Sequence, residues 1–338
     1  MGKKVLFLGL SLLLLLKSPF PARGQTSELN QIGTSMANFL KIGIGARASA
    51  MGGAFVALSD DISSLYWNPG GLGMLRHNSA IFQNTGWLLD TKLYFLGVSF
   101  DLANRGAVGL SLSSFSSGDI LETTIYQPDG TGRKFDAGNF MAALTYSRQI
   151  TDRFSAGLTL KYVTERLDRE KAATVAIDVG SVFITNFLHN MRIGFALSNL
   201  GGRMTLSGSD LMVQYLMPPG IKYARAQLGT DPWDIPLLIR FGVATDAVRS
   251  QNMRLTLATE VLDTRDYDYR IAAGAELALL QHLFLRGGYK FHYEEENFTV
   301  GGGFTAATPG GIGIRFDYAY VNHKMLNGSQ RFSIILEF

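Results

Sequence analysis

The side chains that most often carry catalysis are few and dispersed in this chain. Its 338 residues include five histidines and no cysteine. Nucleophilic hydrolysis needs a serine beside a histidine, with a third group that orients the imidazole. The best histidine for that role is His292, and the sequence pairs no serine with it. The histidines are therefore interpreted as polar residues of turns, loops and strands, and we expect no enzymatic activity.

Asp60 and Asp61 are adjacent carboxylates, a pattern that also occurs in cation sites. Two carboxylates are far fewer than the about six to eight oxygen ligands that Ca²⁺ takes, and no thiolate is present. We therefore expect no metal and no cofactor, and expect this pair to cap a helix or to contact cations. The predicted strands supply charged candidates that face inward: Lys161, Arg192, Arg240, Arg254, Arg270, Arg286, Lys290, Arg315 and Arg331, with Asp178, Glu260, Glu276, Asp317 and Glu337.

The elements that position these charges are strands. From residue 77 onward apolar and polar residues alternate in successive runs, the pattern of a sheet with one apolar face. Glycine accounts for 38 residues and charged residues for 17%, whereas soluble domains average about 7% glycine and 25% charged residues. The expected strands are 77–87, 91–101, 105–115, 137–150, 154–167, 173–185, 191–200, 235–247, 252–263, 269–279, 282–294, 297–306, 311–321 and 331–338.

The connections between these strands differ by parity. After even-numbered strands they are very short, whereas the two longest, 116–136 and 201–234, both follow odd-numbered strands. Short periplasmic turns and long outer loops are typical of outer-membrane barrels. No run after residue 24 is long and apolar enough for a membrane-spanning helix, and a closed sheet pairs every backbone polar group in a bilayer. The sequence predicts an all-β fold, a 14-stranded antiparallel transmembrane β-barrel in the bacterial outer membrane.

The last strand has a lipid-facing row that ends on an aromatic residue. Phe332, Ile334, Leu336 and Phe338 share one face, and Arg331, Ser333 and Glu337 lie on the other. A chain that ends in this way resembles outer-membrane barrels, whose assembly machinery reads the terminal strand. These four apolar residues are the expected assembly signal, and lipid and that machinery are expected partners.

Residues 1–24 have the pattern of a secretory signal peptide. Two lysines precede the apolar run 5–16, and a small-x-small site follows at Ala22-Arg23-Gly24. Removing the four positive charges of this segment (Lys3, Lys4, Lys17 and Arg23) turns the formal charge of +3 into −1. The basic balance therefore belongs largely to the signal, and no nucleic-acid partner is expected.

Residues 25–76 precede the barrel, 77–338, and we expect them to fill it as a hatch. About eight strands already give a filled interior, so fourteen leave room for a plug. Glycine, alanine and serine dominate this segment. Asn68, Pro69 and Gly70 are expected to form a turn and hinge at the start of the barrel, where Gly70 and Gly71 can take positive φ without cost. Trp67 is expected to wedge the plug against the wall.

The hatch segment also carries a family likeness. Its motifs are Gly45-Ala46-Arg47, Met51-Gly52-Gly53-Ala54-Phe55-Val56-Ala57, Asp60-Asp61 and Tyr66-Trp67-Asn68-Pro69-Gly70-Gly71-Leu72. This stretch resembles the N-terminal signature of the PorV/PorQ family, although that family usually has alanine where Gly70 stands. The resemblance implies a FadL-like, hatch-plugged barrel of 14 strands that serves type IX protein secretion. It also marks Arg47, Asp60 and Asp61 as hatch residues.

The long outer loop 201–234 is unusually apolar. Exposed apolar surface of this kind marks a binding site, and methionine suits variable partners. The expected surface comprises Met204, Leu206, Leu211, Met212, Tyr215, Leu216 and Met217. A lid that folds inward over the barrel mouth explains the same composition. Two functions remain open: binding of secreted cargo or secretion-system subunits, and transport of a hydrophobic or amphipathic small molecule.

Removing Phe338 is expected to impair insertion, because the assembly machinery of similar barrels reads the terminal strand. Cell fractionation and a heat-modifiability gel measure the outer-membrane yield and the folded fraction. An unchanged yield and an unchanged band shift would argue against this role for the terminal residue.

Overall fold

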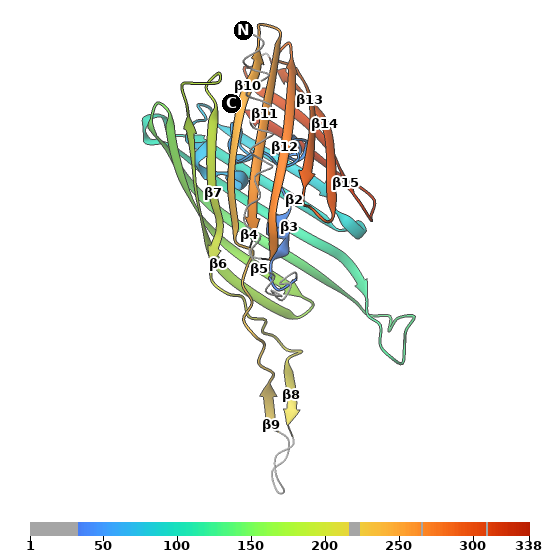
Figure 1. The fold of residues 1–338 in the computed structure, drawn as a ribbon. Coiled ribbons are helices and arrows are strands. Elements are labelled where there is room, and N and C mark those ends of the chain that lie inside the picture. The colour runs from blue at the N-terminus through green and yellow to red at the C-terminus, as the bar shows by residue number, and fades with distance from the viewer. Residues whose placement is uncertain (1–32, 216–223, 265, 309) are drawn as a thin grey trace, which may run out of the picture. The chain divides into compact units, whose positions relative to one another are not determined.

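A closed antiparallel β-barrel forms most of the chain (Figure 1). The computed structural model describes residues 33–215, 224–264, 266–308 and 310–338; the expected signal peptide lies outside them. Fourteen of the described strands close the barrel, with β1 paired to both β2 and β16, which confirms the predicted fold. The barrel strands are β1 (Ser79–Gly86), β2 (Lys92–Asp101), β3 (Ala107–Leu121), β4 (Lys134–Thr151), β5 (Phe154–Leu167), β6 (Glu170–Ile184), β7 (Arg192–Gly201), β10 (Leu238–Arg249), β11 (Met253–Thr264), β12 (Tyr267–Leu279), β13 (Leu283–Phe291), β14 (Glu296–Ala307), β15 (Gly313–His323) and β16 (Ser329–Glu337).

The two ends of the barrel can be told apart by their connections. At one end Asn78 and Phe338 exchange two backbone hydrogen bonds of 3.1 and 2.9 Å, where the first and last strands meet. The longest connections, residues 122–133 and 202–237, lie at the other end, which is the outer end by the usual barrel rule. Two outer connections, 168–169 and 265–266, are nevertheless as short as the periplasmic turns, so the expected sorting by parity holds only for the longest loops.

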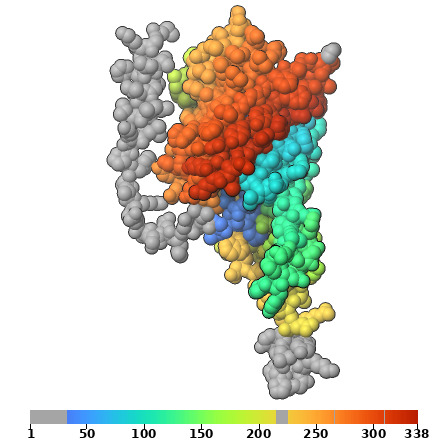
Figure 2. Space-filling model, turned by 90° about the vertical axis from the view of Figure 1, so that its right-hand side faces the viewer, coloured from blue at the N-terminus to red at the C-terminus, as the bar shows by residue number. Residues whose placement is uncertain are grey.

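The strand faces follow the predicted alternation. Along β16 and at the residue after it, Phe332, Ile334, Leu336 and Phe338 are exposed toward the lipid side, whereas Arg331 and Ser333 are buried. Figure 2 shows the outside of the closure, where the red C-terminal strands lie against the cyan strands of the early chain. Among the described residues, no helix is long and apolar enough to cross a membrane.

The loop between β7 and β10 contains a small sheet of its own. Strands β8 (Met212–Tyr215) and β9 (Ala224–Gln227) pair with each other and with no barrel strand (Figure 1). At the base of this hairpin, Met204 and Trp233 exchange two backbone hydrogen bonds of 2.8 Å. Sequence patterning missed this hairpin because strands of four residues are too short to display a period.

The hatch, described here as residues 33–76, lies inside the barrel and consists of turns and short helices. Its helices are η1 (Asn38–Lys41), α2 (Ala46–Ala50), α3 (Ser64–Trp67) and α4 (Pro69–Leu72); η2 (Leu88–Asp90) and η3 (Ala103–Arg105) lie in barrel connections. Most hatch side chains are buried, including Phe55, Met51 and Leu65. The hatch thus supplies much of the core of this protein.

Inward-facing glycines let the hatch touch the wall closely. A Cβ at Gly157 would lie 2.4 Å from the Pro69 carbonyl oxygen, and one at Gly194 would lie 2.3 Å from that of Val56. Such separations are possible only because glycine has no side chain. We call these wall residues the glycine belt: Gly97, Gly109, Gly157, Gly180, Gly194, Gly242, Gly274, Gly288 and Gly301.

The five barrel strands outside the glycine belt contact the hatch through side chains. They do so from Gln83 of β1, Ser147 of β4, Glu260 of β11, Arg315 of β15 and Arg331 of β16. Every one of the fourteen barrel strands therefore contacts the hatch.

Gly288 and Gly287 form a matched test of the glycine belt within β13. A Cβ at position 288 would lie 2.2 Å from the Gly52 nitrogen, whereas one at 287 meets nothing nearer than 4.0 Å. Gly288→Ala is expected to lower the free energy of unfolding by about 1–3 kcal/mol through overpacking. Gly287→Ala is expected to change it by about 0.5 kcal/mol or less. Heat-modifiability gels across a temperature series compare the unfolding midpoints of the two variants. Equal midpoints would contradict the close contact between Gly288 and the hatch.

Candidate functional site

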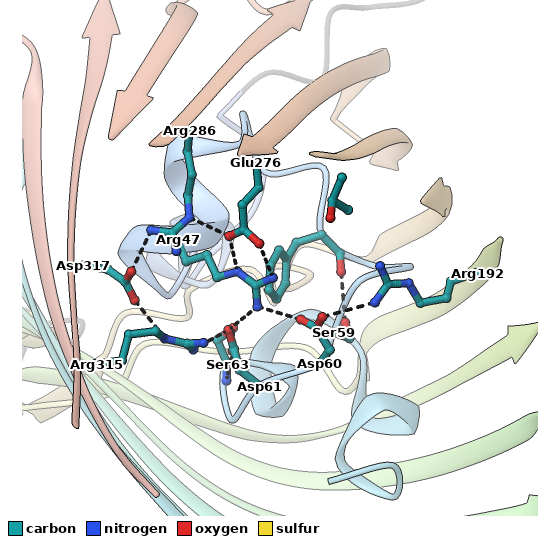
Figure 3. A network of polar contacts seen from close by, with 12 residues as sticks. Arg47, Ser59, Asp60, Asp61, Ser63, Arg192, Glu276, Arg286, Arg315 and Asp317 are labelled. Carbon is teal, nitrogen blue, oxygen red and sulfur yellow. Dashed lines mark hydrogen bonds and ion pairs between the residues drawn. The ribbon is translucent and has the colours of Figure 1, made fainter. Parts of the chain in front are cut away.

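Arg47 is the centre of a buried charge cluster between hatch and wall (Figure 3). It lies in α2, where small neighbours let the helix approach β13 to β16. Its Nε and Nη2 donate to the two oxygens of Glu276 on β12, at 2.7 and 2.9 Å. Its Nη1 donates to Asp60 at 2.6 Å and to Asp61 at 3.0 Å. One guanidinium thus joins two parts of the hatch to the wall.

Further arginines from the wall complete the cluster. Arg315 donates to Asp61 at 2.7 Å, and Arg192 donates to Asp60 at 3.1 Å. Arg286 links Glu276 at 2.7 Å with Asp317 at 2.6 Å. We call this cluster the hatch network: Arg47, Asp60, Asp61, Arg192, Glu276, Arg286, Arg315 and Asp317. It holds four cations and four anions, so the charges of the network balance.

The pairing keeps the hatch carboxylates ionised. Asp60 keeps 33% of its side chain exposed. Its desolvation acts to raise its pKa, but the charges of Arg47 and Arg192 outweigh this and hold that pKa well below its ordinary value. Burial likewise opposes ionisation of Asp61, and Arg315 and Arg47 lower its pKa overall. Asp61 also accepts the backbone N–H of Ser63 at 2.9 Å, next to α3. Of the two roles expected for this acidic pair, the structure has cation pairing; Asp61 closes a turn before α3 and does not cap it, since the N-cap is Ser63 and no side chain caps that helix.

The segment from Trp67 to Gly70 is built differently from the expected turn. Asn68 caps α4: its Oδ1 accepts the Gly70 N–H at 3.0 Å, and Pro69 occupies the first turn. Positive φ was open to Gly70 and Gly71, but neither adopts it, because both lie in this helix. Gly70 is small for another reason: a Cβ there would lie 2.7 Å from the Ser181 Cα of the wall.

Asn68 also bridges the hatch and the wall. Its Nδ2 donates to the Val56 carbonyl at 2.8 Å and to the Ser181 carbonyl of β6 at 2.9 Å. Trp67 donates from Nε1 to the Ile44 carbonyl at 2.6 Å and lies 5.1 Å from the Arg240 guanidinium of β10. These two side chains thus tie together hatch segments that are distant in sequence.

On the outer side of the hatch lies a cavity of about 520 Å³, which we call the outer chamber. Trp67 and Gly53 belong to its hatch side, and Trp87 and Tyr293 come from the outer connections around it. Its lining includes Arg240, Arg270, Lys290 and Arg331. The sequence identified these cations as inward-facing, but it did not indicate that Trp87 and Tyr293 join them.

The outer-loop residues do not form one exposed surface. Met204 is fully buried because its backbone pairs with Trp233, which sets its side chain in the core. Leu206 packs against the same core, and Leu211 is half-buried. Met212 is exposed on β8. Tyr215 ends β8, and Leu216 and Met217 lie outside the described residues. The inward alternative therefore fits Met204 and Leu206.

The comparison with protein families identifies the chain. The sequence profile described as "Type IX secretion system protein PorV" matches residues 25–264. This chain belongs to the PorV family. The match covers the hatch and the barrel up to β11, and it confirms the resemblance that the hatch motifs indicated. A PorV-family chain with this closed barrel is an outer-membrane protein.

Solved structures share the fold of this PorV-family barrel at low sequence identity. The Pseudomonas putida toluene transporter TodX matches with 14% identity and a TM-score of 0.56, over 87% of this chain and 97% of its own. The Ralstonia pickettii toluene transporter TbuX matches with 13% identity and a TM-score of 0.55, with the same coverage. A Pseudomonas aeruginosa FadL homologue matches with 12% identity and a TM-score of 0.53, over 87% of this chain and 98% of its own. The comparison with curated proteins finds no significant match.

The hatch network predicts a specific pH dependence. Because the folded-state pKa of Asp61 is lowered, its stabilisation is complete above its unfolded pKa, near 3.9, and is lost as the pH falls through the folded value. Asp61→Asn is expected to cost roughly 3–5 kcal/mol at pH 7, because it leaves the hatch network with four cations and three anions, although Arg47 and Arg315 keep other carboxylate partners. That difference should stay constant from pH 8 to 5 and shrink below pH 4. Thermal unfolding measures it, with exposed Asp152→Asn as the control; a difference that varies between pH 8 and 5 would contradict the assignment.

Replacing Asn68 and Pro69 by alanine is expected to loosen the hatch without preventing barrel assembly, because the lost bonds lie within the hatch or join it to the wall, and none joins one strand to another. Planar-bilayer recordings should then show more frequent channel openings than wild type. The lipid-facing substitution Asn84→Ala is the control. Unchanged conductance, with unchanged ligand or cargo binding, would show that this segment does not act as a hinge.

Proposed function

We propose that this barrel binds secreted cargo, or another subunit of the type IX system, at its outer face. The observation that carries the proposal is the contact of the hatch with all fourteen barrel strands. A lumen filled in this way favours binding at the outer rim over passage through the barrel. Membership of the PorV family supports the secretion context.

Apolar side chains on the outer connections support a docking role. Ile125 and Tyr126 are 95% and 93% exposed in the connection between β3 and β4. Met212, Leu228 and Trp233 are exposed on or beside the β8–β9 hairpin. Both segments extend past the paired strands of the barrel. Apolar groups outside the lipid-facing wall are typical of protein contact sites.

The β8–β9 hairpin adds a second means of contact. It is a two-stranded sheet without further strand partners among the described residues. Free strand edges offer backbone N–H and C=O groups to an extended segment of another protein. We infer that the hairpin and the Ile125–Tyr126 tip are the parts that cargo or a secretion subunit contacts first.

The alternative is a transporter of hydrophobic or amphipathic small molecules. It is favoured by the fold shared with TodX and TbuX, which are toluene transporters. Deleting the gene separates the two functions: loss of secreted proteins supports the first, and loss of long-chain fatty-acid uptake supports the second.

A hairpin deletion tests the docking role more sharply. Met204 and Trp233 already pair, so a short turn can replace residues 205–232 without opening the barrel. We expect this variant to reach the outer membrane, to keep its heat-modifiable band, and to lose secretion of cargo into the medium. Quantitative proteomics of the medium measures the effect. A normal secreted proteome in the hairpin variant would contradict the proposed role.

A further inference from the structure

The outer chamber has the size of a small-molecule site. Its volume of about 520 Å³ lies within the usual range of about 300–1,000 Å³ for ligand pockets. Aromatic rings and charged groups converge in it: Trp67 and Trp87, with Arg240 and Arg331. The hatch network lies apart from this lining, so the chamber is a separate feature.

Most cations of the chamber already have an acidic partner. Lys41 contacts Asp266, and Lys290 contacts Glu296. Arg240 lies 3.3 Å from Glu260, and Arg270 lies 3.4 Å from Glu295. The remaining acid of the lining, Glu165, accepts the Ala37 N–H at 2.6 Å and an amide hydrogen of Asn139 at 3.3 Å.

Arg331 is the exception. It is only 3% exposed, and within the described part of the chain no carboxylate lies within ion-pair distance of it. Its Nη1 donates to two neutral oxygens, the Gly43 carbonyl at 2.9 Å and the Ser49 hydroxyl at 2.7 Å. Its Nε has no hydrogen-bond partner there. The charge of Glu296 acts on Arg331 only from beyond contact distance. A buried cation without a contacting carboxylate is costly.

Arg240 has unused donor capacity as well. Its partner Glu260 also accepts the N–H groups of Phe55 and Val56, at 3.0 and 2.8 Å. Nη1 of Arg240 has no hydrogen-bond partner among the described residues. Each of the two arginines lies near an indole ring: Arg240 is 5.1 Å from Trp67, and Arg331 is 5.4 Å from Trp87.

We propose that the outer chamber is a binding site for a carboxylate attached to an aromatic or apolar body. The carboxylate accepts hydrogen bonds from Arg331, whose planar donors suit an oxyanion. The body packs on Trp87 and Trp67. This carboxylate can belong to a free organic acid or to the end of a peptide, because the same groups recognise both.

The ligand enters from the outer face, because the hatch contacts every strand beneath the chamber. The chamber therefore acts as a blind receptor pocket. This proposal stands apart from the secretion role, since binding is measured on the purified barrel alone.

The experiment uses the purified full-length barrel in detergent and follows tryptophan fluorescence, because two of the three tryptophans line the chamber. The probes are 3-phenylpropanoate and its neutral amide, and N-acetyl-glycyl-phenylalanine and its amide. We expect at least one carboxylate to change the fluorescence saturably. We expect the affinity of its amide to be lower by a factor of about ten or more. Binding by the dipeptide acid alone assigns the site to peptide ends, and binding by phenylpropanoate alone assigns it to free acids.

Two variants locate the site. Arg331→Gln is expected to weaken carboxylate binding about tenfold or more, whereas Arg331→Lys retains part of it and exposed Arg169→Gln leaves it unchanged. Because Arg331 also holds hatch oxygens, Trp87→Ala provides a second test in a residue that makes no hatch hydrogen bond among the contacts described, with calorimetry as the readout. Equal binding of acid and amide, no binding by either acid, or unchanged binding in both Arg331→Gln and Trp87→Ala overturns the proposal.

Discussion

The contact between hatch backbone and wall backbone is the constraint on which the rest of this structure depends. Nine strands present a glycine where the hatch passes, and at several of these positions a methyl group would overlap the hatch main chain. Contacts at that distance leave little room for sliding, because packed interiors are nearly as dense as crystals. Close packing thus holds the hatch around its whole circumference. The polar contacts then form between groups whose positions this packing already restricts.

The ion pairs then specify one position of the hatch among those that the packing allows. Arg47 reaches Asp60 and Asp61 in its own segment and Glu276 on the wall, so a displaced hatch would separate several pairs at once. A buried ion pair adds little net stability compared with apolar packing, but breaking one is expensive. The network therefore specifies where the hatch sits more than it stabilises the barrel.

Alternation and turn chemistry predicted the wall, because strand period and burial are local properties of sequence. The fourteen barrel strands, the lipid-facing row of the last strand and the inward charges all followed from period two. The partner of Arg47 did not, since Glu276 is 229 residues away and any inward carboxylate was a candidate. Gly70 illustrates the same limit: the sequence indicates backbone freedom at a glycine, whereas the structure requires its small size for contact with Ser181. The sequence predicts Met204 at a binding surface, because its composition pattern does not reveal the backbone pairing with Trp233.

The path of the hatch has a consequence for how the barrel is made. Near its first described residues, Met36 donates a backbone hydrogen bond of 3.0 Å to Asp234 in the outer connection before β10, whereas the chain leaves the hatch at the opposite end, where Asn78 meets Phe338. The polypeptide thus runs through the lumen from one mouth to the other before the first strand begins. Such a chain enters a finished barrel only by threading, so the wall must curl around it while the seam between β1 and β16 is still open. Closing that seam turns a bound segment into an enclosed one.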